Sequence, residues 1–562
     1  MFSRRDFLQV SCATVGLLGF GTDLVRASAR QTLTQDDLLN FESVGNVTIT
    51  HITDIHAQLV PIYFREPSIN LGVGEMSGLP PHITGKEFLE KFGIEKGTAS
   101  AYSLSSSDFT ALARDYGRVG GVDRLSTLLN HIRAERPGKT LFLDGGDTWQ
   151  GSYTSLKTGG ADMVKVMNAL ETDAMTAHWE FTYGQERVNE LLEELSFDFL
   201  AGNIRDTEWD EPAFEATSYF ERGGVKIAVI GQAFPYTPIA NPRYKIPDWS
   251  FGIREDEVQA HVDKARAQGA ELVILLSHNG FDVDRKLVSR VSGIDVVLTG
   301  HTHDALPVAI DVNGTLLIAS GSHGKFLSRL DLDVRDGQVK DYRYKLIPVL
   351  SDVIEPDPAM TALVTEIRQP HQQEIDRVLG TTESLLYRRG NLNGTFDDLI
   401  CDALLSERDA EIALSPGFRW GASLLPGQEI TVDDVYNMTA ITYPNAYRNE
   451  MTGETLKNVL EDVADNLFNQ DPYYQQGGDM VRVGGMGYHI NPNAQIGSRI
   501  SNMTLLKTGE KIDASKAYVV SGWASVNEDV QGPAIYDVVS DYIVKQKTVT
   551  VNPHNAVKLR RS

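Results

Sequence analysis

The sequence is poor in cysteine, in long apolar runs and in positive charge. Its two cysteines are Cys12, near the amino terminus, and Cys401, so residues 30–562 cannot form an internal disulfide. No stretch after residue 29 approaches the ~20 apolar residues that a transmembrane helix needs. Lys and Arg number 52 against 76 Asp and Glu, which gives a formal net charge of −24. Nucleic acids and anionic membranes bind clustered Lys and Arg, so we predict neither as a partner.

The first 29 residues have the pattern of an export signal. Arg4 and Arg5 precede a moderately apolar stretch at residues 10–24, and Ala27-Ser28-Ala29 follows it. This order is typical of the twin-arginine pathway, which carries folded proteins. The alternative is a chance arginine pair before a short core helix. We predict a signal peptide at residues 1–29 and a periplasmic product.

Residues 47–349 alternate short β-rich runs with amphipathic segments. Strands are predicted at residues 47–53, 140–145, 197–203, 225–231, 271–277, 295–300, 315–321 and 328–334, and helices at 122–135, 161–170, 186–195 and 256–268. The strands are too apolar to alternate cleanly, as expected when both faces of a sheet are covered. This pattern predicts a layered α/β domain, which we assign to residues 30–350.

Two later regions depart from this alternation. Residues 351–379 read as a linker that contains a polar helix from residue 361, and residues 380–562 as a second, smaller α/β domain. Within it, Cys401 lies at helical spacing among apolar residues, so we predict a buried structural thiol. Residues 63–115, rich in Gly, Pro and Ser, interrupt the first domain. A loop of this length is usually functional, and we predict that it shapes the rim of the site.

Acidic and histidine side chains lie among the strands of the first domain, and nearly all of them come just after a short apolar run. They occur in THITDIHAQ, LFLDGGDTWQGS, TAHWEFTYG, VILLSHNG and VVLTGHTHD, as Asp54, His56, Asp147, His178, His278, His301 and His303. Each motif alone is weak, because a turn carboxylate or a satisfied core histidine is common. Together they should converge at one edge of the sheet, where open α/β sheets bind ligands. Carboxylates and imidazoles without thiolates suit Mn²⁺, Fe²⁺, Co²⁺ or Zn²⁺.

The order D-x-H, G-D, H-x-E, S-H-N, G-H-x-H resembles the calcineurin-like metallophosphoesterases, in their 5′-nucleotidase branch. The resemblance implies an α/β/β/α sandwich followed by a substrate-binding domain, whose marks here are the DAL helix, ALSPGFRWG and GGMGY. It also implies two metal ions bridged by Asp147. Asp54, His56 and His303 would complete one site, and His178, His278 and His301 the other. Such ions activate a water-derived nucleophile and clamp a tetrahedral anion.

One position departs from the nucleotidase pattern. Where that branch has Gly-Asn-His-Glu, this chain has Ala177-His178-Trp179-Glu180. An indole cannot act as a general acid or base, so the leaving group should depart readily as an anion. Thiols, with a pKa of roughly 8–9, and the more acidic persulfides meet this requirement.

Trp179, the HWEFTYG string, the 63–115 insertion and the signal together resemble the SoxB family of thiosulfohydrolases. The resemblance implies cleavage of the sulfur–sulfonate bond of a cysteine S-thiosulfonate on a SoxYZ-type carrier, with release of sulfate. It favours two Mn²⁺ ions. We also expect a monomer or a dimer.

Substrate contacts are assigned within the same resemblance. Arg419 in SPGFRWG should bind sulfonate oxygens, because a guanidinium engages such anions in a bidentate way. The alternative is a surface ion pair. Trp179 is assigned to the catalytic site, either for its effect on the leaving group or as a wall that excludes water, with a core aromatic as the alternative. Trp420 and Tyr488 are candidate aromatics, and His323 could lie close behind the ligands.

Two other functions remain possible at this point. One is an exported 5′-nucleotidase or nucleotide-sugar phosphohydrolase, which the replacement at Trp179 disfavours. The other is a metal-dependent binding protein without catalysis. A full set of ligands for two ions disfavours that function, because a site without catalysis would not require both metals.

Overall fold

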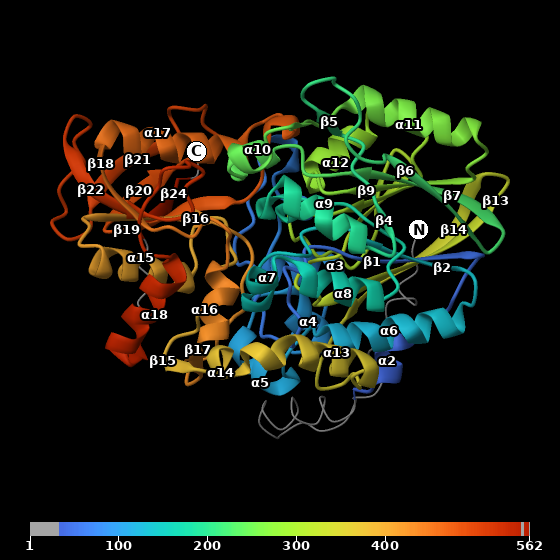
Figure 1. Cartoon of the computed structure of the whole chain (residues 1–562), viewed down its shortest axis with the longest axis horizontal. Coiled ribbons are helices and arrows are strands. Elements are labelled where there is room, and N and C mark those ends of the chain that lie inside the picture. Colours follow the sequence, from blue (N-terminus) through green and yellow to red (C-terminus); the bar gives the residue numbers. More distant parts are fainter. Residues whose placement is uncertain (1–32, 552–555, 561–562) are drawn as a thin grey trace.

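The computed structural model describes residues 33–551 and 556–560. The predicted signal peptide lies outside the described residues, so it stays a prediction. Within these ranges, no helix combines the length and the apolar character that crossing a membrane requires. Figure 1 shows an amino-terminal half, coloured blue to yellow, beside a carboxyl-terminal half in orange and red.

The amino-terminal half contains two six-stranded sheets. In order across the first sheet, the strands are β14 (Gln338–Pro348), β13 (Phe326–Arg335), β1 (Val47–Ile52), β2 (Thr140–Asp144), β3 (Ala174–Met175) and β4 (Asp198–Phe199). The second sheet consists of β11 (Ile310–Val312), β12 (Thr315–Ala319), β10 (Val296–Thr299), β9 (Leu272–Ser277), β7 (Val225–Gln232) and β6 (Thr217–Arg222). In the first, β1 to β4 are parallel. In the second, β7, β9, β10 and β12 are parallel.

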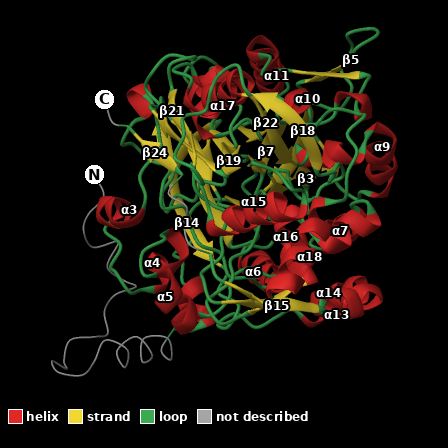
Figure 2. Ribbon diagram, turned by 90° about the vertical axis from the view of Figure 1, so that its left-hand side faces the viewer, coloured by secondary structure: helices red, strands yellow, loops and turns green. Residues whose placement is uncertain are grey.

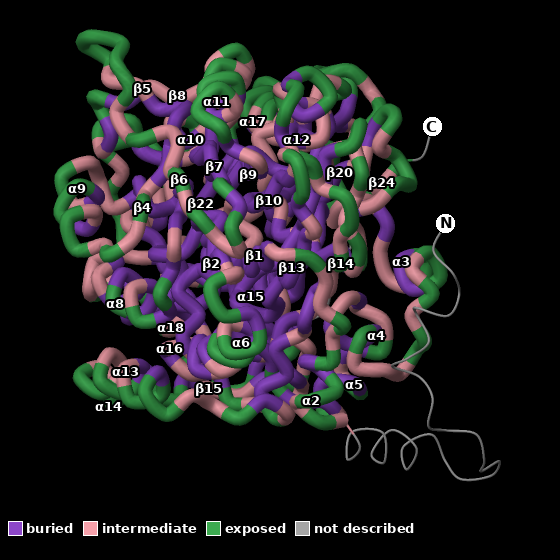
Figure 3. Tube along the Cα trace, turned by 90° about the vertical axis from the view of Figure 1, so that its right-hand side faces the viewer, coloured by how far each residue is buried: buried purple, intermediate pink, exposed green. Residues whose placement is uncertain are grey.

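The two sheets pack face to face and each has helices on its outer face. Strand β9 shows the arrangement, because Ile274 packs into the core between the sheets while Val273 and Leu275 pack on the outer side. Helices α6 (Val122–Glu135) and α8 (Ala161–Ala169) cover the first sheet, and α11 (Glu255–Ala267) and α12 (Phe281–Val288) cover the second. The central strands are buried (Figure 3). The predicted α/β/β/α sandwich is confirmed.

The carboxyl-terminal half contains three smaller sheets. These are β18 (Tyr447–Thr452), β22 (Ala517–Gly522), β16 (Ile412–Gly417) and β19 (Asp479–Gly484); β21 (Ile500–Leu505), β20 (Met486–Ile490) and β24 (Val557–Leu559); and β17 (Glu429–Thr431), β15 (Val378–Thr382) and β23 (Thr548–Val549). Helices α15 (Thr395–Glu407), α16 (Val432–Thr439), α17 (Gly453–Phe468) and α18 (Ile535–Gln546) pack on them. Cys401 is fully buried in α15, and burial raises the pKa of its thiol, as a structural role requires.

The predicted helix at residues 361–379 is wrong over its last part. Helix α13 (Pro358–Arg368) is followed by a 3₁₀ turn (Gln369–His371) and the short α14 (Gln372–Ile375), and Val378 already belongs to β15. Pro370 lacks the amide hydrogen that a continuous helix needs. Met360 and Val364 of α13 belong to the core outside the first sheet, so this helix packs on the amino-terminal half.

Residues 63–115 are more ordered than the predicted loop. They contain α3 (Gly85–Phe92), α4 (Ala99–Leu104) and all but the last residue of α5 (Phe109–Tyr116), which lie at one side of the molecule in Figure 2. Helix α5 buries Leu112 and Tyr116 in the core outside the first sheet. Each helix has at most eight residues, too few for its apolar spacing to stand out in the sequence.

Candidate metal centre

The seven candidate ligands all follow strands whose carboxyl ends meet at one edge of the sandwich. Asp54 and His56 follow β1, and Asp147 and His178 follow β2 and β3. From the second sheet, His278 follows β9, and His301 and His303 follow β10. Parallel strands bring their carboxyl ends to the same edge, so residues distant in sequence become neighbours.

The structure brings all seven together as two buried groups that share Asp147. One contains Asp54, His56, Asp147 and His303, and the other Asp147, His178, His278 and His301. In each group the candidate ligand atoms lie within 4.8 Å of one another. The same division follows from the resemblance to the phosphoesterases.

Backbone strain is concentrated at this cluster. Asp54, His56, Asp147, His301 and His303 have φ between 47° and 73°, in the left-handed region. Such a conformation costs a residue other than glycine on the order of 1–3 kcal/mol and persists only where its surroundings impose it. Here the loops bind one another: the amide of Asp54 donates to the Gly146 carbonyl at 2.8 Å, and that of His56 to the Asp147 carbonyl at 2.9 Å.

Hydrogen bonds to backbone carbonyls orient two of the imidazoles. The Nδ1–H of His278 donates to the Gly145 carbonyl at 2.6 Å, which leaves Nε2 3.1 Å from Asp147 Oδ2. The Nδ1–H of His56 donates to the Gln150 carbonyl at 3.2 Å, and its Nε2 lies 3.1 Å from His303 Nε2. A bond of this kind fixes the tautomer and points the other nitrogen at the site, as in metal centres.

Burial shifts the pKa values of the candidate ligands away from those of the free side chains. Burial raises the pKa of the Asp54 carboxyl to about 8, although nearby His278 opposes this. Burial also lowers the pKa of His56 to about 4, so its imidazole is neutral at neutral pH. Although burial opposes it, Asp147 and Asp54 raise the pKa of His278 to about 10. Divalent cations would replace the protons that Asp54 and His278 hold at neutral pH. The residues present therefore fit divalent metal ions, of a hard or borderline kind.

A further buried carboxylate, Glu180, organises the loops that carry two of these residues. Its oxygens accept hydrogen bonds from the amides of His178 at 2.7 Å, Thr148 at 2.5 Å, Trp149 at 3.2 Å and Asp147 at 3.3 Å. Sequence reasoning missed this role. The available signal was a charged residue within the aromatic string HWEFTYG.

Trp179 lies directly against the cluster. Its amide donates to Asp147 Oδ1 at 2.7 Å, and its side chain is buried. The indole meets the rings of Phe418 and Trp420 edge-on, with centroids 5.3 Å and 5.1 Å away. Phe418 and Trp420 stack at 4.1 Å, whereas Tyr488 belongs to a different core of the carboxyl-terminal half. Trp179, Phe418 and Trp420 thus form an aromatic wall beside the cluster.

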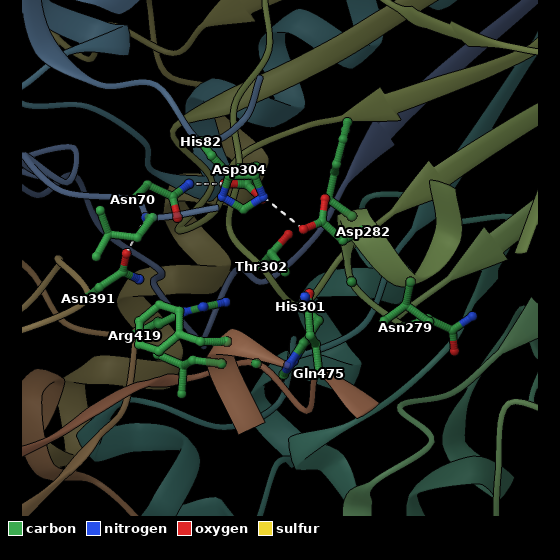
Figure 4. Close-up of a pocket in the computed structure, with 17 residues that line it drawn as sticks. Asn70, His82, Asn279, Asp282, His301, Thr302, Asp304, Asn391, Arg419 and Gln475 are labelled. Carbon is green, nitrogen blue, oxygen red and sulfur yellow. Dashed lines mark hydrogen bonds and ion pairs between the residues drawn. The ribbon is translucent and has the colours of Figure 1, made fainter. Parts of the chain in front are cut away.

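Arg419 follows β16 and reaches the cluster from the carboxyl-terminal half. It lines a small cavity together with His301 (Figure 4). Its guanidinium bonds to the Gly478 carbonyl and lies 3.6 Å from an oxygen of Asp479. Arg419 is therefore paired with a carboxylate, as the alternative considered from sequence has it, but that carboxylate is the buried Asp479 and not one at the surface.

His323 lies behind the cluster, outside the two ligand groups. Its amide donates to the Asp54 carbonyl at 2.8 Å, and its Nε2 accepts from the Gly421 amide at 3.1 Å. Its ring centroid is 5.5 Å from that of His56. The residue therefore links the carboxyl-terminal half to the loop of Asp54 and His56.

Residues 63–115 contribute to the rim, as predicted. Asn70, Leu71 and His82 line the same cavity as His301 and Arg419. Asn70 donates to Asp304 at 3.1 Å, and the amide of Leu71 donates to the Asn391 side chain at 2.5 Å.

Comparison with known proteins agrees with this architecture. The calcineurin-like phosphoesterase model matches residues 47–305, and the 5′-nucleotidase C-terminal domain model matches residues 378–532. The structure of the sulfate thiohydrolase SoxB of Thermus thermophilus is 37% identical, with a TM-score of 0.90, over 92% of this chain and 98% of that one. This chain belongs to the SoxB family. The family lies in the 5′-nucleotidase branch of the calcineurin-like phosphoesterases.

More distant relatives share the fold. A 5′-nucleotidase precursor structure from Thermus thermophilus is 20% identical, with a TM-score of 0.72, over 92% of this chain and all of that one. The 5′-nucleotidase of mouse is 25% identical over 80% of this chain and 87% of its own. Membership of the SoxB family, together with the two buried groups, supports a metal-dependent hydrolase with a dinuclear site.

Proposed function

We propose that this protein is a thiosulfohydrolase that cleaves the sulfur–sulfonate bond of a cysteine S-thiosulfonate on a SoxYZ-type carrier. The observation that carries the proposal is Trp179, whose amide holds the shared carboxylate and whose side chain offers no proton to a leaving group. The likeness to the Thermus sulfate thiohydrolase supports the same substrate class. The nucleotidase alternative is not favoured.

Seven residues would hold two metal ions. Asp54, His56, Asp147 and His303 would bind one, and Asp147, His178, His278 and His301 the other. When bound, two divalent ions polarise the oxygens of a tetrahedral anion and lower the pKa of water. We propose Mn²⁺, while the donor set also suits Fe²⁺, Co²⁺ and Zn²⁺.

The surrounding residues position the substrate and exclude water. Arg419 binds oxygens of the sulfonate, and the indole of Trp179 closes the side of the site that faces Phe418 and Trp420. In the balanced reaction, R–S–S–SO₃⁻ and water give R–S–S⁻, sulfate and two protons. The persulfide leaves as an anion, so the sulfur side needs no proton donor.

The cellular setting follows from the same proposal. Export in the folded state through the twin-arginine pathway would place the enzyme in the periplasm, after its site has assembled. The carrier is then a periplasmic protein with its thiosulfonated cysteine on a segment that reaches the buried cluster. We propose that the enzyme acts as a monomer or a dimer.

The experiment is single-turnover sulfate release from a carrier peptide that ends in a thiosulfonated cysteine. We expect release with the Mn²⁺-loaded protein and little hydrolysis of AMP or UDP-sugars. Sulfate release would exclude a binding protein without catalysis. Robust AMP turnover without sulfate release would instead establish the nucleotidase.

A further inference from the structure

The cavity beside His301 has a second basic side chain on its wall, His82. This residue comes from the segment at residues 63–115, whereas Arg419 comes from the carboxyl-terminal half. Figure 4 shows His82 bonded to Asp282 on one side of the cavity, with Arg419 on another. His82 has no part in the proposed hydrolysis.

The surroundings of His82 favour its charged form. Its Nε2–H donates to Asp282 Oδ2 at 2.8 Å, and its side chain is 13% exposed. Burial opposes the charged form, but the carboxylates of Asp282 and Asp304 outweigh it and raise the pKa of the imidazole, against a small effect of Arg419. These three groups are the charges that face His82 from α12, from the loop after β10 and from the loop after β16.

Both basic residues have unused donors. The Nδ1 of His82 is buried and has no hydrogen-bond partner among the described residues. The same holds for Nη1 of Arg419 within that part of the chain. The same wall also carries two oxygens, Asp282 Oδ1 and Asn279 Oδ1, that are unpaired within the described chain. Because a buried charged donor without an acceptor is costly, an acceptor that arrives with a ligand would stabilise the two basic residues.

We propose that His82 is an anion-binding residue of this cavity and that, with Arg419, it binds the oxygens of a tetrahedral oxyanion. The identity of the anion, the sulfonate of the substrate or the sulfate released from it, rests on the proposed function. The competing explanation is that His82 and Asp282 form an ion pair that only attaches residues 63–115 to α12. The two explanations differ in what the charge of His82 does to anion affinity.

The test measures binding of inorganic sulfate to the full Mn²⁺-loaded chain by calorimetry between pH 6 and 9. His82→Gln keeps a neutral hydrogen-bond donor but removes the charge. We expect sulfate affinity at pH 7 to fall about tenfold to a hundredfold, as for loss of one charge-assisted hydrogen bond. His131→Gln, the same exchange at an exposed position of α6, should leave affinity unchanged. His82→Lys, which retains a cation, should recover part of the affinity.

The outcomes separate this inference from the proposed function. Unchanged sulfate affinity in folded His82→Gln, with only a lower unfolding temperature, would establish the structural ion pair and overturn the proposal. If His82→Gln fails to fold, the variants His82→Lys and Asp282→Asn replace it in the test. Sulfate affinities of both variants that equal the native affinity across the whole pH range would overturn the proposal. A His82-dependent sulfate site in a protein that releases no sulfate from the carrier peptide would refute the proposed function alone.

Discussion

At the scale of single residues, Asp147 connects the parts of the candidate metal centre. Its Oδ2 lies 3.1 Å from the nearest ring nitrogens of both His178 and His278, and 3.8 Å from Nε2 of His56. Its Oδ1 accepts the amide of Trp179 at 2.7 Å. One carboxylate therefore connects both ligand groups with the wall of the site. Opposing its burial, His178 and His278 hold the pKa of Asp147 well below its usual range.

Asp147→Ala should remove both metal ions, because each group loses a ligand. Metal analysis of the purified variant should show well under one ion per chain, against about two in the native protein. His56→Ala, which changes one group, is the control and should lose mainly one ion. An Asp147→Ala protein that retains one full equivalent would contradict a bridging role.

Trp179→His tests the leaving-group argument. An imidazole at this position restores a proton donor, so hydrolysis of AMP should rise at least tenfold over the native protein. The exchange also leaves space beside Phe418 and Trp420, with a stability cost of about 2–4 kcal/mol. Trp179→Phe keeps an aromatic wall without a donor and is the control. Equal AMP hydrolysis in both variants would show that Trp179 controls access instead.

At the scale of elements, a segment of the carboxyl-terminal half at residues 469–478 lies across the site. Asp471 pairs with Lys286, and the Tyr473 hydroxyl donates to Glu255 at 2.5 Å. Further along, the carbonyl of Gln476 accepts from His301 Nε2 at 3.0 Å. This segment therefore connects the outer helices of the second sheet to a candidate ligand.

Gly477→Ala should disturb the group that contains His301. Gly477 has a φ of 74°, and a Cβ there would collide with the His301 imidazole. Gly478→Ala is a matched control, because its φ is 78° but the nearest atom would be 3.7 Å away. Both variants carry similar backbone strain. We expect metal content and sulfate release to fall severalfold further in Gly477→Ala, and equal values in the two would refute a steric effect on His301.

At the scale of the whole molecule, the site depends on both halves of the chain. Arg389 Nη2 donates to the Thr302 carbonyl at 3.0 Å, between His301 and His303. Gln58, two residues after His56, donates to Asn437 of α16 at 3.2 Å. His323 makes a further connection at the same boundary, because its Nε2 accepts from the Gly421 amide. The loops of the cluster are thus held from both sides.

Removing metal should lower the stability of the entire chain. Ions that bind only the folded protein stabilise it by about 4 kcal/mol at a thousandfold excess over Kd. Calorimetry with EDTA should therefore show a lower unfolding temperature, restored by added Mn²⁺. The same scan on Asp147→Ala should show no response to EDTA. If EDTA leaves the unfolding temperature of the native protein unchanged, the protein does not contain a bound metal pair.

The ligands could be found from sequence because strand–loop junctions carry them. Apolar runs such as the one before His278 mark buried strands, and parallel strands end at a common edge. Helix α6 was also predicted at its observed bounds, and α8 and α11 within one residue of theirs. The short helices of residues 63–115 were not, because two turns give too little periodic signal.

Sequence motifs sufficed for the ligand types, and the family resemblance that they carry implied the division into two groups and the likeness to thiosulfohydrolases. The bonds of Glu180 to the loop of Thr148, of His82 to Asp282 and of Gln476 to His301 depend on folding, because each joins segments that nothing in their local sequence relates. Local pattern reflects which face of an element is buried. Which buried polar groups meet is decided only when the two sheets and the two halves pack against one another.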